Sequence, residues 1–435
     1  MPVVTRFPPS PTGLFHIGSA RTALFNYLFA AKAGGHMYLR FEDTDKERSK
    51  QEYEKDIIAG LQWLGIPYTP ASPLRQSEKI DTYRTYLHKL IEKGAAYEAE
   101  AGERGGKVVR FKNPNVRITF SDLIRGEVSF DTAELKDFVI ARNADDPLYH
   151  LAVVADDHDM GITHVIRGED HISNTQRQIL ILEALGFERP AYAHIPLILA
   201  PDRSKLSKRN FAASVNDYRA DGYIPQAFLN YLVLLGWTPP SGKEKLSLKE
   251  IISEFDLVAV HKSGAIFDLQ KLKWLNREYM LEIPDDAYLA EMLRRAHSWD
   301  SNKDIAAKLV PLVKERVGVW QEFDMVKHDF EYFFTEPKLD PAKLPGKGSD
   351  AEIGSKHLGH LRKLFAAMPS QDEMTAEQVK AHIWEYAEAE GRGKVLWPLR
   401  YALTGREKSP DPFTVASIIG KEAAERRIDA ALRIL

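Results

Sequence analysis

Apolar and polar positions in the first forty-five residues follow the order strand, loop, helix, strand. Residues 3–7 form a short apolar run, and three prolines and a glycine within the next six residues predict a loop. Helical spacing of apolar residues then begins after Ser19 and ends at Gly34-Gly35. The apolar positions of this helix are Ala20, Leu24, Tyr27, Leu28 and Ala31. With a second strand at 37–41, the order predicts the first unit of a doubly wound α/β sheet, which binds ligands at the carboxyl ends of its strands.

The remaining pattern is mixed up to residue 209 and helical beyond it. The predicted helices cover 46–64, about 81–93 and the segment with Ile179, Leu182 and Leu185; the predicted strands cover 108–112, 116–120, 126–131, 148–154, 162–167 and 195–199; residues 95–107 are predicted as a Gly-rich loop. A linker is predicted at 337–355, which is rich in Pro, Gly, Lys and Asp.

Composition sets the class of protein. A chain of 435 residues is too long for one core and suggests about two to four domains. With 44% hydrophobic and 28% charged residues, it resembles soluble globular proteins, and no apolar run reaches the roughly 18 residues of a membrane span. No secretory signal is evident at the N-terminus, so we expect a cytoplasmic protein. The absence of cysteine excludes disulfides, thiolate catalysis and Cys-zinc sites, whereas the net charge of −3 does not exclude a nucleic-acid partner.

Two segments are candidates for phosphate chemistry. His16, Gly18 and Ser19 lie at the predicted helix N-terminus, where free N–H groups and the helix dipole favour phosphate. A strand, loop and helix occur in many α/β proteins, so a structural role for His16 stays open on this evidence alone. The second segment is the basic run at 205–209, which in isolation is typical of a solvated loop.

The acidic cluster at 156–159 (Asp-Asp-His-Asp) has two interpretations. Its residue types suit a metal ion. However, consecutive carboxylates point in different directions, and no second cluster completes a coordination shell. The simpler interpretation is the polar end of the predicted strand at 148–154.

Together, the segments around His16 and Lys208 resemble the paired HIGH and KMSKS signatures of class I aminoacyl-tRNA synthetases. The surrounding sequence resembles bacterial glutamyl-tRNA synthetases over nearly the whole chain. The matching segments are 6–13 (RFPPSPTG), 40–45 (RFEDTD), 165–171 (VIRGEDH) and, for the anticodon-binding part, 393–405.

The resemblance implies a Rossmann-type parallel-sheet catalytic domain with a mixed α/β insertion, followed by all-α stem-contact and anticodon-binding domains. The implied boundaries are 1–94 and 148–209 for the two catalytic halves, 95–147 for the insertion, 210–283 for the stem-contact domain and 284–435 for the anticodon-binding domain. Many bacterial members have a longer insertion with a cysteine-rich zinc site; this chain has a short loop and no cysteine, so we expect no zinc.

The implied reaction joins L-glutamate to tRNA-Glu, and possibly tRNA-Gln, through a glutamyl-adenylate made from ATP. Mg²⁺ is expected on the phosphates, held mostly by substrate and water. Implied ATP contacts are His16, Gly18, Ser19, Asp170, Lys205, Ser207, Lys208 and Arg209, of which His16, Ser19, Lys205 and Lys208 are the catalytic candidates. Implied glutamate contacts are Arg6, Ser10, Glu42, Tyr149 and Arg167, and implied tRNA contacts are Lys394 and Arg400. The family is usually monomeric, and no membrane partner is expected.

Three alternatives stay open at this level. A glutamyl-queuosine-tRNA synthetase-like enzyme shares the catalytic half but lacks the anticodon-binding domain, which disfavours it. Glutaminyl-tRNA synthetase has a β-barrel C-terminal part, whereas this chain reads as helical there. A non-catalytic tRNA-binding paralogue has no need of His16, Lys208, Arg6 and Glu42.

Overall fold

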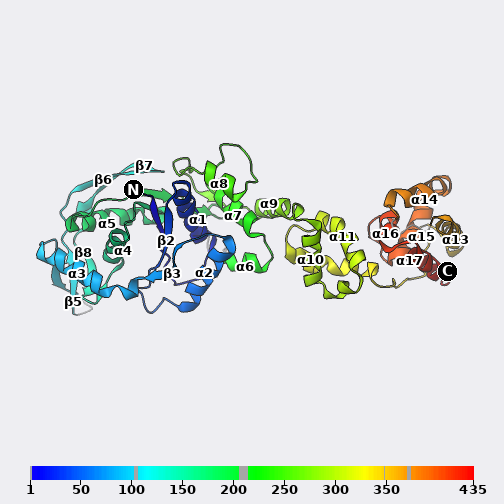
Figure 1. The fold of residues 1–435 in the computed structure, drawn as a ribbon, viewed down its shortest axis with the longest axis horizontal. Helices are drawn as coiled ribbons and strands as arrows, with labels where there is room; N and C mark the ends of the chain where they lie inside the picture. The colour runs from blue at the N-terminus through cyan, green and yellow to red at the C-terminus, as the bar shows by residue number, and fades with distance from the viewer. Residues whose placement is uncertain (1, 102–105, 205–213, 347, 370–373) are drawn as a thin grey trace. The chain divides into compact units, whose positions relative to one another are not determined.

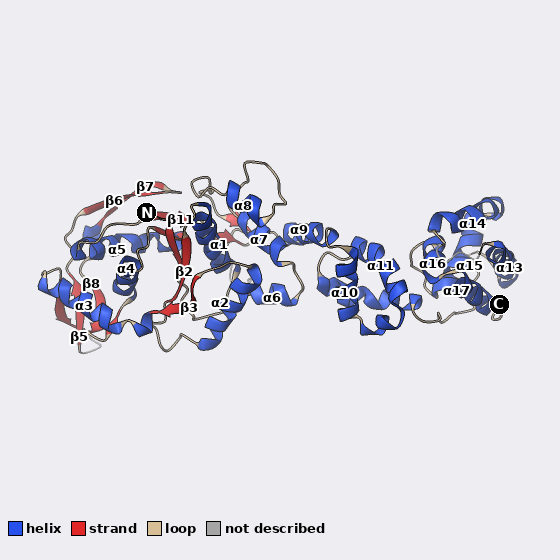
Figure 2. Cartoon of the chain, viewed as in Figure 1, coloured by secondary structure: helices blue, strands red, loops and turns tan. Residues whose placement is uncertain are grey.

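The computed structural model describes residues 2–101, 106–204, 214–346, 348–369 and 374–435 (Figure 1). The chain divides into two compact units, Met1–Tyr279 and Met280–Leu435. Throughout the described ranges, strands occur in the first unit and the second unit is helical (Figure 2). None of the helices in these ranges has the length and apolar character to cross a membrane.

Parallel strands form the centre of the first unit. One sheet has the order β1 (Val4–Phe7), β2 (His36–Phe41), β3 (Thr69–Arg75), and another has the order β10 (His164–Gly168), β11 (Ala191–Ile195), β6 (Arg117–Asp122), β7 (Gly126–Asp131). The backbone N–H of Thr163, just before β10, donates to Val4 O at 3.0 Å. This bond sets β1 beside β10, so the carboxyl ends of both strands open at one edge.

Two smaller sheets complete the strands of this unit. The antiparallel sheet of the insertion has the order β4 (Ala96–Glu100), β5 (Lys107–Phe111), β8 (Phe138–Asn143), β9 (Asp146–Pro147), and a two-stranded parallel pair joins β12 (Ile198–Leu199) to β13 (Ala265–Ile266). The helices are α1 (Ile17–Lys32), α2 (Gln51–Leu64), α3 (Ile80–Glu92), α4 (Tyr149–Asp159), α5 (Ile172–Leu185), α6 (Val215–Ala220), α7 (Pro225–Leu234), α8 (Leu248–Glu254) and α9 (Leu269–Leu281).

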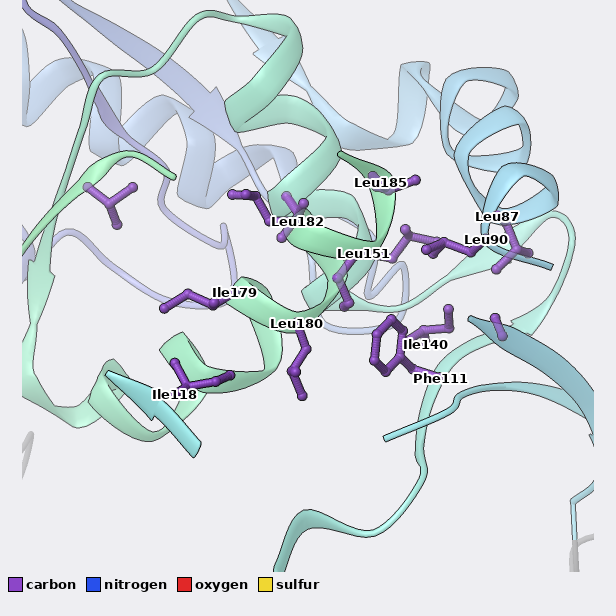
Figure 3. Packing of buried hydrophobic residues seen from close by; sticks show 14 of the residues in the cluster. Leu87, Leu90, Phe111, Ile118, Ile140, Leu151, Ile179, Leu180, Leu182 and Leu185 are labelled. Carbon is purple, nitrogen blue, oxygen red and sulfur yellow. The ribbon is translucent and has the colours of Figure 1, made fainter. Parts of the chain in front are cut away.

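One hydrophobic core joins the insertion to the catalytic sheet. Figure 3 shows leucines of α3 and α5 packed around Leu151 of α4, with Phe111 of β5 and Ile140 of β8 on the insertion side. These side chains are at most 5% exposed. Because these elements share one core, the insertion packs tightly against α3, α4 and α5.

The second unit consists of helices in its described part. They are α10 (Asp285–Arg295), α11 (Lys303–Arg316), α12 (Trp320–Val326), α13 (Ala351–Ala367), α14 (Ala376–Glu390), α15 (Arg392–Thr404), α16 (Pro412–Ile419) and α17 (Lys421–Leu432). The capping box at Thr375 begins α14, and Gly405 ends α15 in the left-handed conformation with φ 62°.

Several predicted elements need correction. The apolar run at 148–154 is not a strand but the start of α4. Apolar runs of this length do not distinguish a strand from a buried helix, and the buried Asp156 and Asp157 conceal the helical period. The predicted loop at 95–107 contains β4, which pairs with β5.

Other differences are smaller. Helix α2 begins at Gln51 rather than 46, and α13 begins at Ala351, inside the predicted linker. The strand predicted at 195–199 is split, because Pro196 separates β11 from β12. The finer domain boundaries near 94, 147, 209 and 283 stay predictions.

Candidate active site

A cavity of about 670 Å³ lies at the carboxyl ends of β1, β2 and β10. Every described candidate for ATP or glutamate lines it: Arg6, Ser10, His16, Gly18, Ser19, Glu42, Tyr149, Arg167 and Asp170. The candidates Lys205, Ser207, Lys208 and Arg209 lie outside the described residues. The cavity therefore collects side chains that are up to about 160 positions apart in the sequence at the edge where α/β sheets bind ligands.

His16 caps the helix that opens into the cavity. Its backbone is extended, with φ −103° and ψ 166°, and its Nδ1 accepts the N–H of Ser19 at 3.2 Å. Because Nδ1 accepts, the proton of the neutral ring lies on Nε2, which is 3.1 Å from Ser19 Oγ. A Cβ on Gly18 would lie 3.2 Å from the His16 ring, so glycine makes room for this ring.

The chain that follows residues 205–213 lies against the loop that contains His16. The N–H of Val215 donates to Phe15 O at 2.8 Å. Asp56 of α2 joins both segments: one carboxylate oxygen accepts the N–H of Phe15 at 2.6 Å, and the other accepts Nδ2 of Asn216 at 2.8 Å. The loop before His16 and the start of α6 are thus anchored to a common residue, Asp56.

A buried charge network forms the floor beside β1 and β2. Arg6 and Arg40 are each 1% exposed, and both donate to Asp157, at 3.2 Å from Arg6 Nε and 2.7 Å from Arg40 Nη1. Burial alone would raise the pKa of Asp157, but the two arginines outweigh it and the pKa is lowered. Asp157 therefore stays charged and holds both guanidinium groups in place.

Glu42 is the carboxylate of this network that titrates near neutrality. Arg40 Nη2 donates to it at 3.1 Å. Burial raises the pKa of Glu42 to about 7, against the lowering effect of Arg40. A cationic ligand group beside Glu42 would favour its charged form.

Arg167, at the end of β10, is held differently from Arg6. Its Nε donates to His194 Nε2 at 3.2 Å and its Nη2 to Thr175 Oγ1 at 2.8 Å. Burial lowers the pKa of Arg167, which is 5% exposed. Within the described part of the chain, Nη1 of Arg167 and Nη1 of Arg6 have no hydrogen-bond partner. Each of these two cavity-lining arginines therefore keeps one buried donor without a partner in the described chain.

Comparison with known proteins identifies the family. A family model described as tRNA synthetases class I (E and Q), catalytic domain, matches residues 2–104 and 100–274, and an anticodon binding domain matches 288–432. The chain is 40% identical over 467 residues to the glutamate–tRNA ligase of Nitratidesulfovibrio vulgaris strain Hildenborough, covering 99% of both, and 41% identical over 478 residues to that of Aquifex aeolicus, covering 100% of this chain and 98% of that protein. The chain belongs to the glutamate–tRNA ligase family of class I tRNA synthetases.

A solved structure of this family has the same fold. The crystal structure of a glutamate tRNA ligase from Elizabethkingia meningosepticum, in complex with its amino acid, matches with a TM-score of 0.85 and 33% identity, covering 100% of this chain and 99% of that one. The predicted fold class of a class I synthetase with a helical anticodon-binding part is confirmed.

Several residues of the site have roles that the sequence did not reveal. Asp157 belongs to the cluster interpreted as a polar strand end, yet it is a buried ion-pair partner on a helix. Asp156 likewise accepts from Tyr83 and Gln76, both at 2.9 Å. In the ranges that the structure describes, no group of three or more His, Asp or Glu could hold a metal. No local signal in the sequence marks this pairing, because Arg6 is 151 residues away from Asp157.

The second unit carries the candidate tRNA contacts of a glutamate–tRNA ligase. Lys394 and Arg400 lie on α15, Lys394 exposed and Arg400 half-buried. The Arg400 guanidinium lies 4.9 Å from the Trp397 ring centroid and donates to Glu407 O at 2.8 Å. The Trp397 ring and the Glu407 carbonyl therefore hold the Arg400 guanidinium in place.

Proposed function

We propose that this chain attaches L-glutamate to the 3′ end of tRNA-Glu, using ATP and a glutamyl-adenylate intermediate. The observation that carries the proposal is a pair of buried guanidinium donors, on Arg6 and Arg167, that have no partner among the described residues and belong to one cavity with a capped helix N-terminus. Guanidinium groups suit a carboxylate, and a helix N-terminus suits phosphate. Family membership and full-length similarity to proteins named glutamate–tRNA ligase support the same assignment.

The amino acid would lie between the buried charges. Arg167, with Arg6, would bind the side-chain carboxylate, and Glu42 would pair with the ammonium group. Ser10 and Tyr149 line the same cavity and would contact the α-amino and α-carboxylate groups. These groups orient the α-carboxylate without removing a proton from it.

ATP would bind at the start of α1. His16 Nε2 and the Ser19 hydroxyl are donors for its phosphates, aided by the N-terminal N–H groups. Asp170 and Gly18 line this part of the cavity, and Lys205, Ser207, Lys208 and Arg209 complete the proposed contacts. Mg²⁺, when bound, would neutralise phosphate charge and be held by phosphate oxygens and water.

In the first step, the α-carboxylate attacks the α-phosphorus of ATP and pyrophosphate leaves. A carboxylate is already nucleophilic at neutral pH, so alignment and charge stabilisation suffice. In the second step, the 2′-hydroxyl of the terminal adenosine takes the glutamyl group and AMP leaves. The second unit, through Lys394 and Arg400, would bind the anticodon end of the tRNA. We retain the predictions of a cytoplasmic monomer without zinc.

The decisive experiment is esterification of labelled glutamate onto purified tRNA-Glu and, in parallel, tRNA-Gln. Charging of tRNA-Glu alone would indicate a discriminating enzyme, and charging of both a non-discriminating one. If neither is charged while the protein still binds tRNA, the proposal is wrong and a regulatory paralogue or another acceptor replaces it.

The role of Arg167 has its own test. Arg167→Ala should raise the KM for glutamate roughly a hundredfold, as loss of a buried charged contact does, and leave the KM for ATP nearly unchanged. Arg189→Ala is the matched control, because Arg189 is exposed and pairs with Glu183 on the surface of the same unit. Equal changes in both KM values would contradict a role in amino-acid recognition.

A further inference from the structure

The two arginines of the cavity that are candidates for glutamate binding, Arg6 and Arg167, have different partners. Arg6 is held by the charged carboxylate of Asp157. Arg167 donates to two side chains that carry no negative charge, His194 and Thr175. Across the described residues, Arg167 forms no ion pair with an Asp or Glu of the protein. Of the two candidate glutamate-binding arginines, Arg167 is therefore the one without a contacting carboxylate in the described chain.

The hydrogen bonds determine the protonation state of His194. Its Nδ1 lies 2.6 Å from Asp122 Oδ2, and both side chains are fully buried. Its Nε2 faces two donors, the Arg167 Nε–H at 3.2 Å and the Thr175 hydroxyl at 3.1 Å. A proton on Nε2 would oppose the Arg167 donor, so the ring is neutral with its proton on Nδ1, directed at Asp122. Burial lowers the pKa of His194, which is consistent with the neutral ring.

The network is rigid because each member comes from a different element. Arg167 and His194 are register partners on the parallel strands β10 and β11. Asp122 ends β6, and its carboxylate also accepts the backbone N–H of His194 at 3.3 Å. Thr175 lies on α5 and is completely buried. The Nε and Nη2 atoms of Arg167 are thereby fixed, and Nη1 of this cavity-lining residue has no hydrogen-bond partner in the described chain.

We propose that His194, oriented by Asp122, is a positioning and specificity-determining residue: it aims Arg167 at the ligand's side-chain carboxylate without placing a carboxylate of the protein in direct contact with the guanidinium. The inference rests on the proposed function. A carboxylate in place of His194 or Thr175 would satisfy Arg167 in the free protein, and a charged ligand would then gain little over its amide. His194 and Thr175 orient the guanidinium through neutral acceptors. The carboxylate that Arg167 favours must therefore come from the ligand.

Four variants test the proposal by tRNA charging, with the glutamate KM, ATP KM and kcat measured separately and glutamine as the competing amino acid. His194→Gln removes the ring acceptor and should raise the glutamate KM roughly ten- to one-hundredfold through misplacement of Arg167, with the ATP KM unchanged. Thr175→Asp places a carboxylate beside Arg167 and should reduce the kcat/KM preference for glutamate over glutamine at least about tenfold. Thr175→Val removes the hydroxyl without adding charge, and its preference should fall less than that of Thr175→Asp. His164→Gln, at the opposite end of β10, is the matched control and should behave as wild type.

A double-mutant cycle distinguishes positioning from general structural damage. If His194 acts through Arg167, adding His194→Gln to Arg167→Ala should change the glutamate KM no further. Additive effects, an equal rise in the ATP KM, or equal preferences in Thr175→Asp and Thr175→Val would overturn the proposal. If His194→Gln does not fold, the Thr175 pair alone decides the question. A wild-type protein that charges no tRNA would refute the proposed function; wild-type charging with an unaffected His194→Gln would refute only this inference.

Discussion

Glu42 makes the use of glutamate depend on pH near neutrality. Its carboxylate is buried among charged groups, and burial raises its pKa to about 7. Only the ionised form can pair with the ammonium group of the amino acid. Glutamate should therefore bind better as the pH rises through this pKa, whereas an ordinary carboxylate would be fully ionised throughout the range.

The magnitude follows from the titration curve. With a pKa of about 7, about one-tenth of Glu42 is ionised at pH 6 and about nine-tenths at pH 8. The kcat/KM for glutamate, which reports on the free enzyme, should rise about tenfold between these values. The kcat/KM for ATP at saturating glutamate should change much less, because bound glutamate stabilises the charged carboxylate.

The assay is tRNA charging from pH 6 to 8.5 with wild type, Glu42→Gln and the surface control Glu183→Gln. Glu42→Gln cannot ionise, so its kcat/KM for glutamate should be low and should lose the tenfold rise. Glu183→Gln should keep the wild-type profile, because Glu183 is exposed and is not among the residues that line the cavity. A slope that persists in Glu42→Gln would refute the assignment of the titration to Glu42.

The pH dependence of the unfolding free energy provides an independent test of the Glu42 pKa. The folded-state pKa of Glu42 lies above the unfolded value of 4.5, so its contribution to stability is complete below pH 4.5 and is lost as the pH rises to about 7. At about 1.4 kcal/mol per pH unit, the loss over this window is about 3 kcal/mol. Glu42→Gln should lack this decline in its unfolding free energy. Parallel curves for the two proteins would contradict the shifted pKa.

Three further predictions test other parts of the molecule. Asp157→Asn leaves two buried arginines without their shared carboxylate and should lower the unfolding free energy by about 3–5 kcal/mol, measured by chemical denaturation. Gly18→Ala brings a Cβ to 3.2 Å from the His16 ring. Because this should move the ring, the kcat should fall roughly tenfold. Gly359→Ala is the control, since a Cβ at that position meets open space. Arg400→Ala should raise the KM for tRNA roughly tenfold without changing the KM for glutamate.

Each of these predictions has an outcome that contradicts it. A loss below about 1 kcal/mol in Asp157→Asn would mean that the arginines find other partners or water. Equal activity of Gly18→Ala and Gly359→Ala would mean that the His16 ring position is not critical. An unchanged tRNA KM in Arg400→Ala would place the RNA surface elsewhere on the second unit.

The local pattern of apolar and polar residues was sufficient to predict the first strand–loop–helix–strand unit. The strands predicted at 3–7 and 37–41 and the helix between them are confirmed as β1, β2 and α1. Here the apolar period, the prolines and the terminal glycine all indicate the same structure, which is the condition under which sequence reasoning succeeds. The motif residues also line one cavity, because strand ends converge at a sheet edge.

The error at residues 148–154 arose where buried polar residues interrupt the pattern. Helix α4 contains Asp156 and Asp157, and a sequence cannot tell a buried carboxylate from an exposed one without its distant partner. That partner for Asp157 is Arg6, 151 residues away. The His194–Asp122 contact spans 72 residues and carries no local signal at all. Long-range polar pairing is therefore the part of the site that sequence reasoning misses.

Long-range polar pairing also distinguishes Arg6 from Arg167, two arginines that look equivalent in the sequence. Both lie next to the last residue of a parallel strand, both are buried, and the Nη1 atom of each has no partner in the described chain. Asp157 compensates the charge of Arg6, whereas His194 and Thr175 only orient Arg167. An uncompensated buried charge destabilises the free protein, and a ligand carboxylate that meets it recovers this free energy. Selectivity for glutamate over glutamine should therefore depend more on the side chains that hold Arg167 than on the mere presence of Arg6 or Arg167.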